Sequence, residues 1–298
     1  MGPARTVFVA LVLGVITIVL MPLQILATRF HWRLAALLPY YWQRIARWLI
    51  GLRVRVSGTP AKPPLLLTAN HISWLDITVL GSVMPLSFVA KAEVAGWPVL
   101  GTLARLQRTV FIDRTKRSQT GAATAEIARR VGGGDVMVLF AEGTTGDGNR
   151  ILPFRSALIG AAGAAAGANV ITVQPVAVTY TRLGGIPVGA SDRPGLAWYG
   201  EMPFIAHFSR LIGRGGIDAI VNFGEPIQFT PESDRKKVAE ACFEAVREMD
   251  ELARTATSYS GKGDRLFSPQ PKDAKGTEGP AAGELAGQAG ERIVNRVS

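Results

Sequence analysis

The sequence predicts an α/β protein in which a membrane helix precedes a central mixed sheet flanked by helices. Three observations carry this prediction. A long uncharged apolar stretch lies near the amino terminus, short apolar segments alternate with helical patterns through the middle, and the carboxy-terminal stretch is rich in Ser, Gly, Pro, Lys and Glu. We therefore expect a membrane anchor with an interfacial helix at 1–52, a folded domain at 53–256 and a disordered tail at 257–298.

The apolar stretch between residues 6 and 28 contains no charged residue. As a helix, about 22 residues extend roughly 33 Å, which is enough to cross the hydrocarbon core of a bilayer. A signal peptide with Arg5 in its charged region is the competing interpretation, but the stretch is long for one and no clear A-x-A cleavage pattern follows it. We expect an uncleaved anchor, and Pro22 leaves a half-inserted or re-entrant helix open.

Positive charge follows the anchor directly. The chain carries 33 Lys and Arg against 23 Asp and Glu, and no acidic residue precedes Asp76. Because the arginines between residues 29 and 47 outnumber the single Arg5, the positive-inside rule places the rest of the chain in the cytoplasm, at the cell's inner membrane. Residues 32–52 repeat aromatic, aliphatic and Arg residues, which predicts a helix in the headgroup layer of an anionic membrane. A helix packed on the domain is the alternative.

The middle of the chain supplies the strands and helices of the predicted sheet in alternation. Short runs rich in β-branched and apolar residues predict the strands. They cover 53–57, 65–69, 87–90, 109–112, 136–140, 170–180 and 218–223. The intervening segments are typical of helices. They cover 73–83, 97–106, 120–131, 156–166 and 231–255.

Particular residues predict where the helices begin and end. Ser73 is interpreted as the N-cap of the first helix in the domain, and the three glycines at 132–134 end the helix before them. Thr230 is the predicted N-cap of the last helix, with Pro231 at its first position. Cys242 lies in that helix, where we expect a small buried residue.

Several protein classes lack their sequence signature in this chain. A single cysteine excludes an internal disulfide and disfavours a Cys-based zinc site. The nucleophile elbow of α/β-hydrolases, the P-loop and the dinucleotide fingerprint are all missing. No nucleic-acid-binding motif is evident, so we expect no nucleic-acid partner.

The first chemically suggestive cluster directly follows the apolar strand at 65–69 and contains His71 and Asp76. Five residues along a regular helix would set the two side chains about 140° apart. They meet only if His71 lies in the turn and Asp76 in the helix behind it. A carboxylate in contact with one ring nitrogen fixes the tautomer and supports the imidazolium that forms when the ring acts as a base.

Two further polar clusters accompany the histidine. The strand at 136–140 leads into a Gly-rich loop that begins with Glu142, at the sheet edge where sites of α/β proteins gather. A turn with a solvated glutamate is the alternative. A basic cluster extends from Arg105 to Arg117, and a solvated face is its alternative.

Together these residues resemble the lysophospholipid acyltransferase family, typified by 1-acyl-glycerol-3-phosphate acyltransferase. Four family motifs occur in family order over roughly residues 45–250. They are N-H-x₄-D at Asn70, His71 and Asp76, F-I-x-R at Phe111, Ile112 and Arg114, F-P-E-G-T at Phe140, Glu142, Gly143 and Thr144, and V-x-P-V-x-V at residues 173–178. The resemblance implies the fold of the glycerolipid acyltransferases.

The resemblance also implies a mechanism, in which His71 takes the proton of a lysolipid hydroxyl and Asp76 orients His71. The alkoxide then attacks the thioester of acyl-CoA or acyl-carrier protein, which are co-substrates, and no cofactor is expected. Further residues are expected to bind substrate, with Arg114 as a phosphate contact. They are Arg114, Glu142, Gly143, Thr144, Arg108 and Lys91.

The motifs depart from the family pattern at three positions. Ala141 replaces the usual Pro, Arg108 the usual Gly, and Thr145 an Arg that many glycerophosphate acyltransferases have. Lysophosphatidate is the first expected acceptor, with phosphatidate as product. The alternative acceptor is lyso-ornithine lipid, because the loop at 142–149 resembles the form of its acyltransferases. A non-catalytic membrane protein that binds lipid is the alternative of a different class.

Overall fold

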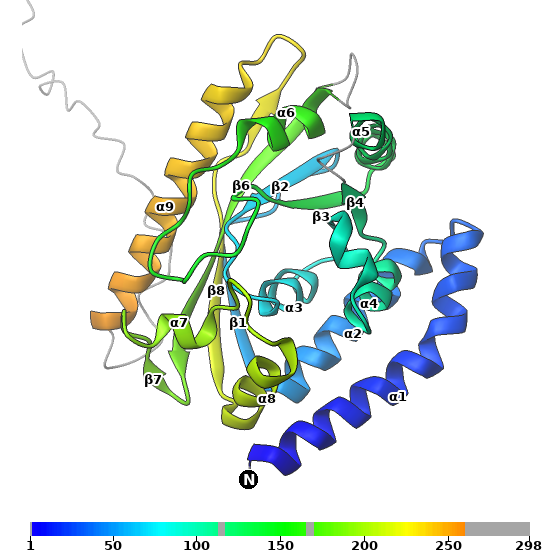
Figure 1. Ribbon diagram of the computed structural model, residues 1–298. Helices are drawn as coiled ribbons and strands as arrows, with labels where there is room; N and C mark the ends of the chain where they lie inside the picture. The colour runs from blue at the N-terminus through cyan, green and yellow to red at the C-terminus, as the bar shows by residue number, and fades with distance from the viewer. Residues whose placement is uncertain (1, 113–116, 165–169, 260–298) are drawn as a thin grey trace, which may run out of the picture. The chain divides into compact units, whose positions relative to one another are not determined.

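A mixed sheet runs through the computed structural model, as predicted (Figure 1). The structure describes residues 2–112, 117–164 and 170–259. Its strands are β1 (Leu52–Ser57), β2 (Leu65–Ala69), β3 (Ser87–Lys91), β4 (Val110–Ile112), β5 (Val136–Phe140), β6 (Ile171–Leu183), β7 (Ile186–Pro187), β8 (Ile217–Phe223) and β9 (Ile227–Phe229). The main order is β1-β8-β6-β2-β5-β3-β4, and β7 and β9 pair with β6.

The strands that carry the predicted motifs are parallel neighbours. β6, β2, β5, β3 and β4 run in one direction, and β8 is antiparallel to β6. β2 and β5 have the predicted bounds, because each is a continuous apolar run that is buried on both faces. Parallel pairing brings the carboxyl ends of these strands to one edge of the sheet.

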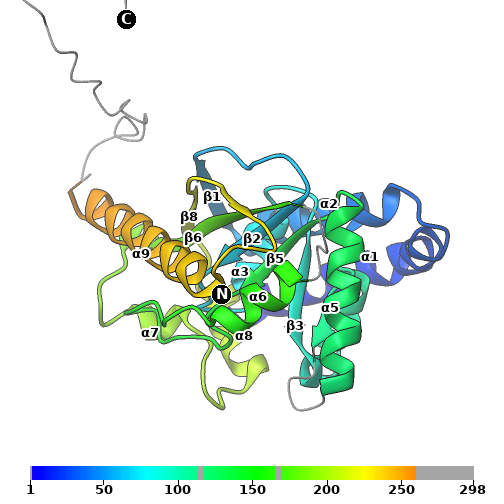
Figure 2. The ribbon, with the colours of Figure 1, turned by 90° about the horizontal axis from the view of Figure 1, so that it is seen from above.

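Helices cover both faces of the sheet. They are α1 (Gly2–Arg29), α2 (Leu34–Ile50), α3 (Leu75–Gly81), η1 (Ala92–Gly96), α4 (Leu100–Leu106), α5 (Arg117–Gly132), α6 (Ser156–Ala164), α7 (Arg193–Leu196), α8 (Phe204–Arg214) and α9 (Arg235–Tyr259). One hydrophobic cluster joins α5, α6 and α9 to the sheet, and a second joins α2, α3 and α8 to its other face (Figure 2). Cys242 is fully buried in the first of these clusters, as predicted.

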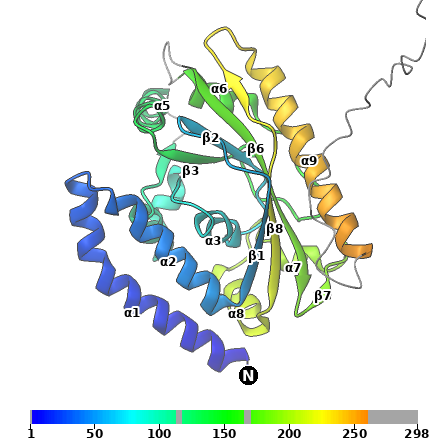
Figure 3. The same cartoon turned by 180° about the vertical axis from the view of Figure 1, so that it is seen from behind.

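The helix α1 lies outermost, against α2 and α8 (Figure 3). It is long and apolar enough to cross a membrane. Both of its ends nevertheless contact the domain: Arg5 donates to the carbonyls of Ile50 and Ile212, and Gln24 donates to the carbonyl of Leu106. These contacts tie both ends of the candidate membrane span to the domain.

An apolar surface that no described residue covers extends along α1 and α2. Its exposed members recur every three or four residues on α1, as one face of a helix does. They are Val7, Phe8, Leu11, Val15, Ile18, Val19, Leu23, Ile25 and Leu26 on α1, with Tyr41, Ile45 and Trp48 on α2. The guanidinium of Arg44 lies over the ring of Tyr40 on the same helix. Exposed apolar rings beside arginines are typical of a membrane interface.

Two predicted caps are wrong. Ser73 makes no cap hydrogen bond, and its buried hydroxyl has no partner among the described residues. Thr230 lies before a turn and contacts Ser233, so α9 begins only at Arg235. There Asp234 accepts a hydrogen bond from the backbone N–H of Lys236. A short polar side chain that satisfies early N–H groups can sit at any of several positions in a polar loop, and the sequence does not choose among them. The predicted tail from residue 260 onward lies outside the described residues.

Candidate active site

The sheet brings the first and third motifs to one edge. β2 and β5 are paired so that Ala69 lies opposite Phe140. His71 and Glu142 follow these two residues by the same number of positions, so both leave the sheet at the same level. The backbone N–H of His71 donates to Oε1 of Glu142 over 2.7 Å, which joins the two motifs directly.

Asn70 directly follows β2, and its side-chain amide, instead of its backbone, pairs with the neighbouring strand β6. Its amide donates to the carbonyl of Val178 over 2.9 Å and accepts from the N–H of Val178 over 2.8 Å. This reciprocal pair continues the ladder between β2 and β6 for one step. The backbone of Asn70 is thereby released to turn out of the sheet, and His71 stands in that turn.

His71 and Asp76 are in contact, as predicted. Nδ1 of His71 lies 2.8 Å from Oδ2 of Asp76. Because a carboxylate only accepts, Nδ1 carries the proton of the neutral ring and Nε2 has a free lone pair. The separation of five residues works because His71 precedes α3, whereas Asp76 lies in its first turn.

Asp76 is fully buried, and its two oxygens accept four hydrogen bonds. Oδ2 accepts from His71 and from the backbone N–H groups of Ile72 and Ser73. Oδ1 accepts from the hydroxyl of Tyr180 over 2.7 Å. Burial and the negative charge of Asp76 raise the pKa of Tyr180 well above its usual range, so the phenol stays protonated and donates. Asp76 is therefore held rigidly behind the histidine.

The imidazole of His71 is supported on one side and open on another. Its ring stacks on that of Phe140 with centroids 3.9 Å apart and planes at 13°. The side chain is 20% exposed. Among the described residues, Nε2 has no hydrogen-bond partner. A histidine with one nitrogen fixed by a buried carboxylate and the other available is the arrangement of a general base.

Glu142 is buried and supports the backbone of the site. Its Oε1 accepts from the N–H of His71, and its Oε2 accepts from the N–H of Leu152 over 2.9 Å. Burial raises the pKa of Glu142 to about 7. Both carboxylate oxygens are thus used inside the protein, so in this structure Glu142 positions the histidine turn and the loop behind it.

The loop after Glu142 is tied to the histidine and to α9. The N–H of Gly146 donates to the carbonyl of His71 over 2.9 Å. Gly143 has a φ of +72°, a conformation that favours glycine, and this explains the glycine of the motif. Arg254 of α9 donates to the carbonyls of Gly148 and Asn149. The loop is therefore a fixed wall of the site.

The remaining predicted residues lie in three different places. Lys91 is the exposed last residue of β3, and the register puts it at the same sheet edge as His71. Thr144, at the start of the loop, is also exposed. Arg114 lies outside the described residues. Arg108 precedes β4 and is therefore at the opposite, amino edge, where it pairs with Asp135. The prediction that Arg108 joins the site is not met. Arg108 precedes β4 whereas His71 follows β2, and parallel strands place their amino and carboxyl ends at opposite edges of the sheet.

Tyr180 and Arg254 hold the site, and the sequence analysis missed both. Each contacts its partner across more than 100 residues of chain. The available signal for Tyr180 was its place on the long strand β6, in alternation with Val176 and Val178 on one face. No local pattern indicated Arg254, which lies among other charged residues of α9.

Comparison with known proteins agrees with this geometry. A family model described as Acyltransferase matches residues 53–179. The lyso-ornithine lipid O-acyltransferase of Brucella abortus (strain 2308) is 45% identical over 250 residues, which cover 83% of this chain and 94% of that protein. The lyso-ornithine lipid O-acyltransferase of Rhizobium meliloti (strain 1021) is 39% identical, over 93% of this chain and 92% of that protein.

A solved structure shares the fold. The crystal structure of the 1-acyl-sn-glycerophosphate acyltransferase of Thermotoga maritima superposes with a TM-score of 0.55 at 20% identity, and the match covers 85% of this chain and 97% of that one. The α/β fold with a central mixed sheet is thereby confirmed.

Proposed function

Because the chain belongs to the acyltransferase family, we propose that it transfers a fatty acyl chain from a thioester donor to the free hydroxyl of a lyso-ornithine lipid. The observation that carries the proposal is the contact between His71 Nδ1 and the buried Asp76, with Nε2 free. A hydroxyl acceptor needs a base, and no nucleophilic side chain is needed if the acceptor attacks the donor directly.

The choice of acceptor reverses the order given by the sequence motifs alone. Lysophosphatidate ranked first there, and the lyso-ornithine lipid was the alternative. The two similar relatives are both lyso-ornithine lipid O-acyltransferases, which supports the aminolipid. Thr145 supports it as well, because a threonine supplies no cation for a phosphomonoester where many glycerophosphate enzymes have arginine. Lysophosphatidate remains the second candidate.

The proposed reaction begins with proton transfer from the acceptor hydroxyl to Nε2 of His71. The oxygen attacks the thioester carbonyl, the new C–O ester bond forms and the C–S bond breaks. The departing thiolate takes the proton back from the imidazolium. Asp76 supports the positive charge while it exists, and Tyr180 keeps Asp76 in place. A base of this kind contributes about 10²–10⁴-fold to the rate.

Substrate contacts belong to the same proposal. Gly143 and Thr144 lie in the loop beside His71, and Lys91 is the last residue of β3 at the same edge. Arg114 lies outside the described residues and is included on its motif alone. We assign these residues to the acceptor and the donor, which is acyl-CoA or acyl-carrier protein. The proposal places the protein at the inner membrane with the domain in the cytoplasm, held by the apolar surface of α1 and α2 and by anionic lipids. Detergent should release it, and high salt alone should not.

Acyl transfer by the full chain in membranes tests the proposal. Acyl-CoA and acyl-carrier protein are offered separately, each with lyso-ornithine lipid or lysophosphatidate, and His71→Ala is the inactive variant. A thermal unfolding transition of that variant that matches the wild type shows that it is folded. Product from the aminolipid that disappears with His71→Ala supports the proposal. Product only from lysophosphatidate overturns the acceptor, and no product in any arm favours the non-catalytic lipid-binding class.

A further inference from the structure

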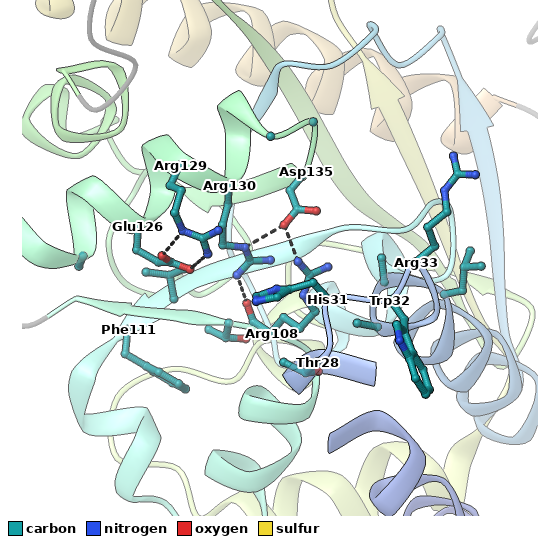
Figure 4. A pocket seen from close by; sticks show the side chains of 18 residues that line it. Thr28, His31, Trp32, Arg33, Arg108, Phe111, Glu126, Arg129, Arg130 and Asp135 are labelled. Carbon is teal, nitrogen blue, oxygen red and sulfur yellow. Dashed lines mark hydrogen bonds and ion pairs between the residues drawn. The ribbon is translucent and has the colours of Figure 1, made fainter. Parts of the chain in front are cut away.

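A second polar site lies at the amino edge of the sheet, one strand length from His71. It is a hollow of about 1240 Å³ between the turn that joins α1 to α2, the segment before β4, and the last turns of α5 (Figure 4). Arginines and two carboxylates line it. They are Arg33, Arg108, Arg129, Arg130, Glu126 and Asp135.

The hollow carries more positive than negative charge. Arg108 and Arg130 both bind the same oxygen of Asp135, over 2.7 and 2.9 Å. Arg129 is 64% exposed and pairs with Glu126. Arg33 is exposed, and its guanidinium has no partner among the described residues; in Figure 4 it points away from the group around Asp135. Two of the four arginines are therefore left without a carboxylate of their own, which favours an anion.

The backbone of the hollow is unusual in two places. His31 and Arg108 have φ of +55° and +61°, and they are two of the three non-glycine residues with positive φ in the described chain. Residues in this conformation persist where their surroundings hold them, and they gather at binding sites. Arg130 provides that hold, since it donates to the carbonyl of Arg108 and to the hydroxyl of Ser87. Arg108 therefore keeps a strained backbone conformation at a position where the family motif usually has glycine.

The surroundings of the hollow match the headgroup layer of a membrane. Phe30 and Trp32 lie in the adjoining turn, are 58% and 50% exposed, and stack on each other. The exposed apolar face of α1 leads up to that turn. Aromatic residues at the end of an apolar helix sit at the level of the headgroups, and basic pockets there take anionic headgroups.

We propose that this hollow binds the phosphate-bearing headgroup of an anionic membrane lipid that is distinct from the acyl acceptor. The acceptor hydroxyl must reach His71 at the carboxyl edge, whereas this headgroup lies at the amino edge. The bound lipid fixes the turn between α1 and α2 against α5, and so sets the position of the domain on the membrane.

Native mass spectrometry of the full chain in detergent tests the inference without any turnover. Phosphatidylglycerol, phosphatidylcholine and inorganic phosphate are added in separate arms, and bound molecules per protein are counted. Arg33→Gln with Arg129→Gln removes exposed charges only. Arg108→Gly removes the central guanidinium and keeps a backbone that glycine tolerates. Arg247→Gln, on the exposed side of α9, matches the one charge lost in Arg108→Gly, and Arg247→Gln with Lys236→Gln matches the two charges lost in the double variant.

The wild type and both control variants should retain one phosphatidylglycerol at concentrations where phosphatidylcholine is lost. Both hollow variants should bind it at least about tenfold more weakly. Equal retention by the hollow variants, or equal binding of phosphatidylcholine, overturns the inference. Binding of inorganic phosphate as strong as that of the lipid would also overturn it, because the site would then take soluble anions. Failure of the proposed acyl transfer would leave this result unchanged.

Discussion

The two edges of the sheet hold charge in opposite ways. At the carboxyl edge, Asp76 and Glu142 are buried, and every oxygen accepts from a backbone N–H, the phenol or the histidine. At the amino edge, the guanidinium groups of Arg108 and Arg130 share Asp135, and Arg108 and Asp135 are partly exposed whereas Arg130 is buried. The arrangement at the carboxyl edge suits catalysis, because a base must be oriented before the substrate binds. The arrangement at the amino edge suits a charged ligand that can bind in several orientations.

The largest expected effect comes from the carboxyl edge. His71→Ala should lower kcat by about 10²–10⁴-fold, since the base is lost. The same variant should bind phosphatidylglycerol as the wild type does, because the hollow lies at the other edge. Steady-state kinetics and lipid counts on one preparation check both statements. A variant that keeps its full rate would show that His71 is not the base.

Glu142 should make stability depend on pH. Its pKa of about 7 lies above the ordinary value of 4.5, so the folded state holds the proton more tightly than the unfolded state. The contribution is full below pH 4.5 and is lost as pH rises to 7, which amounts to about 3 kcal/mol in the free energy of unfolding. Denaturant titrations from pH 5 to 8 measure this slope.

Glu142→Gln is the control for that slope. It should flatten the pH dependence and leave the parts from Asp250, whose pKa burial raises, and from His207, whose pKa burial lowers. It should also lower stability at every pH, because an amide cannot accept from both His71 and Leu152. If the substitution leaves the slope unchanged, groups other than Glu142 cause the pH dependence of stability.

Tyr180→Phe should have the next largest effect. It removes one of four hydrogen bonds to Asp76 and leaves Oδ1 buried without a donor, at a cost of about 1–3 kcal/mol in stability. Because Tyr180 acts through Asp76, kcat should fall about tenfold with KM unchanged. Equal changes in KM and kcat would indicate a general loss of structure.

Thr145→Arg tests the scarcity of cations at the carboxyl edge. One arginine on a phosphate contributes about 1.5–3 kcal/mol, so kcat/KM for lysophosphatidate should rise about tenfold relative to lyso-ornithine lipid. Competition between the two acceptors in one vesicle measures the ratio. An unchanged ratio would show that residue 145 does not determine the choice of acceptor.

The smallest effect on stability is expected for Arg108→Gly. Relief of the positive φ stabilises by about 1 kcal/mol, and the lost partly exposed ion pair costs a similar amount. The free energy of unfolding should therefore change by less than about 1 kcal/mol. A much larger loss would show that Arg108 is retained for folding.

The sequence predicts the carboxyl edge better than the amino edge, for a physical reason. Continuous apolar runs determine β2 and β5, and His71 and Asp76 lie five residues apart, so local pattern is enough. Tyr180 and Arg254 act across more than 100 residues, which no local pattern encodes. The prediction assigned Arg108 to the wrong edge of the sheet. The edge depends on whether a residue precedes or follows its strand, and the motif alone does not show this. The caps Ser73 and Thr230 failed because other side chains, Asp76 and Asp234, accept from the backbone N–H groups near the helix starts.

The bond between Arg5 and the carbonyl of Ile212 also has a consequence for the order of biosynthesis. The partners are 207 residues apart, so α1 leaves the ribosome well before Ile212 and waits for this contact. At about 5–20 residues per second, the wait lasts roughly ten to forty seconds. During that time α1 has no folded domain beside it, and a bilayer is the available cover for its apolar face. We therefore expect the membrane to receive this helix before the domain has folded, and the domain to fold against a helix already in place.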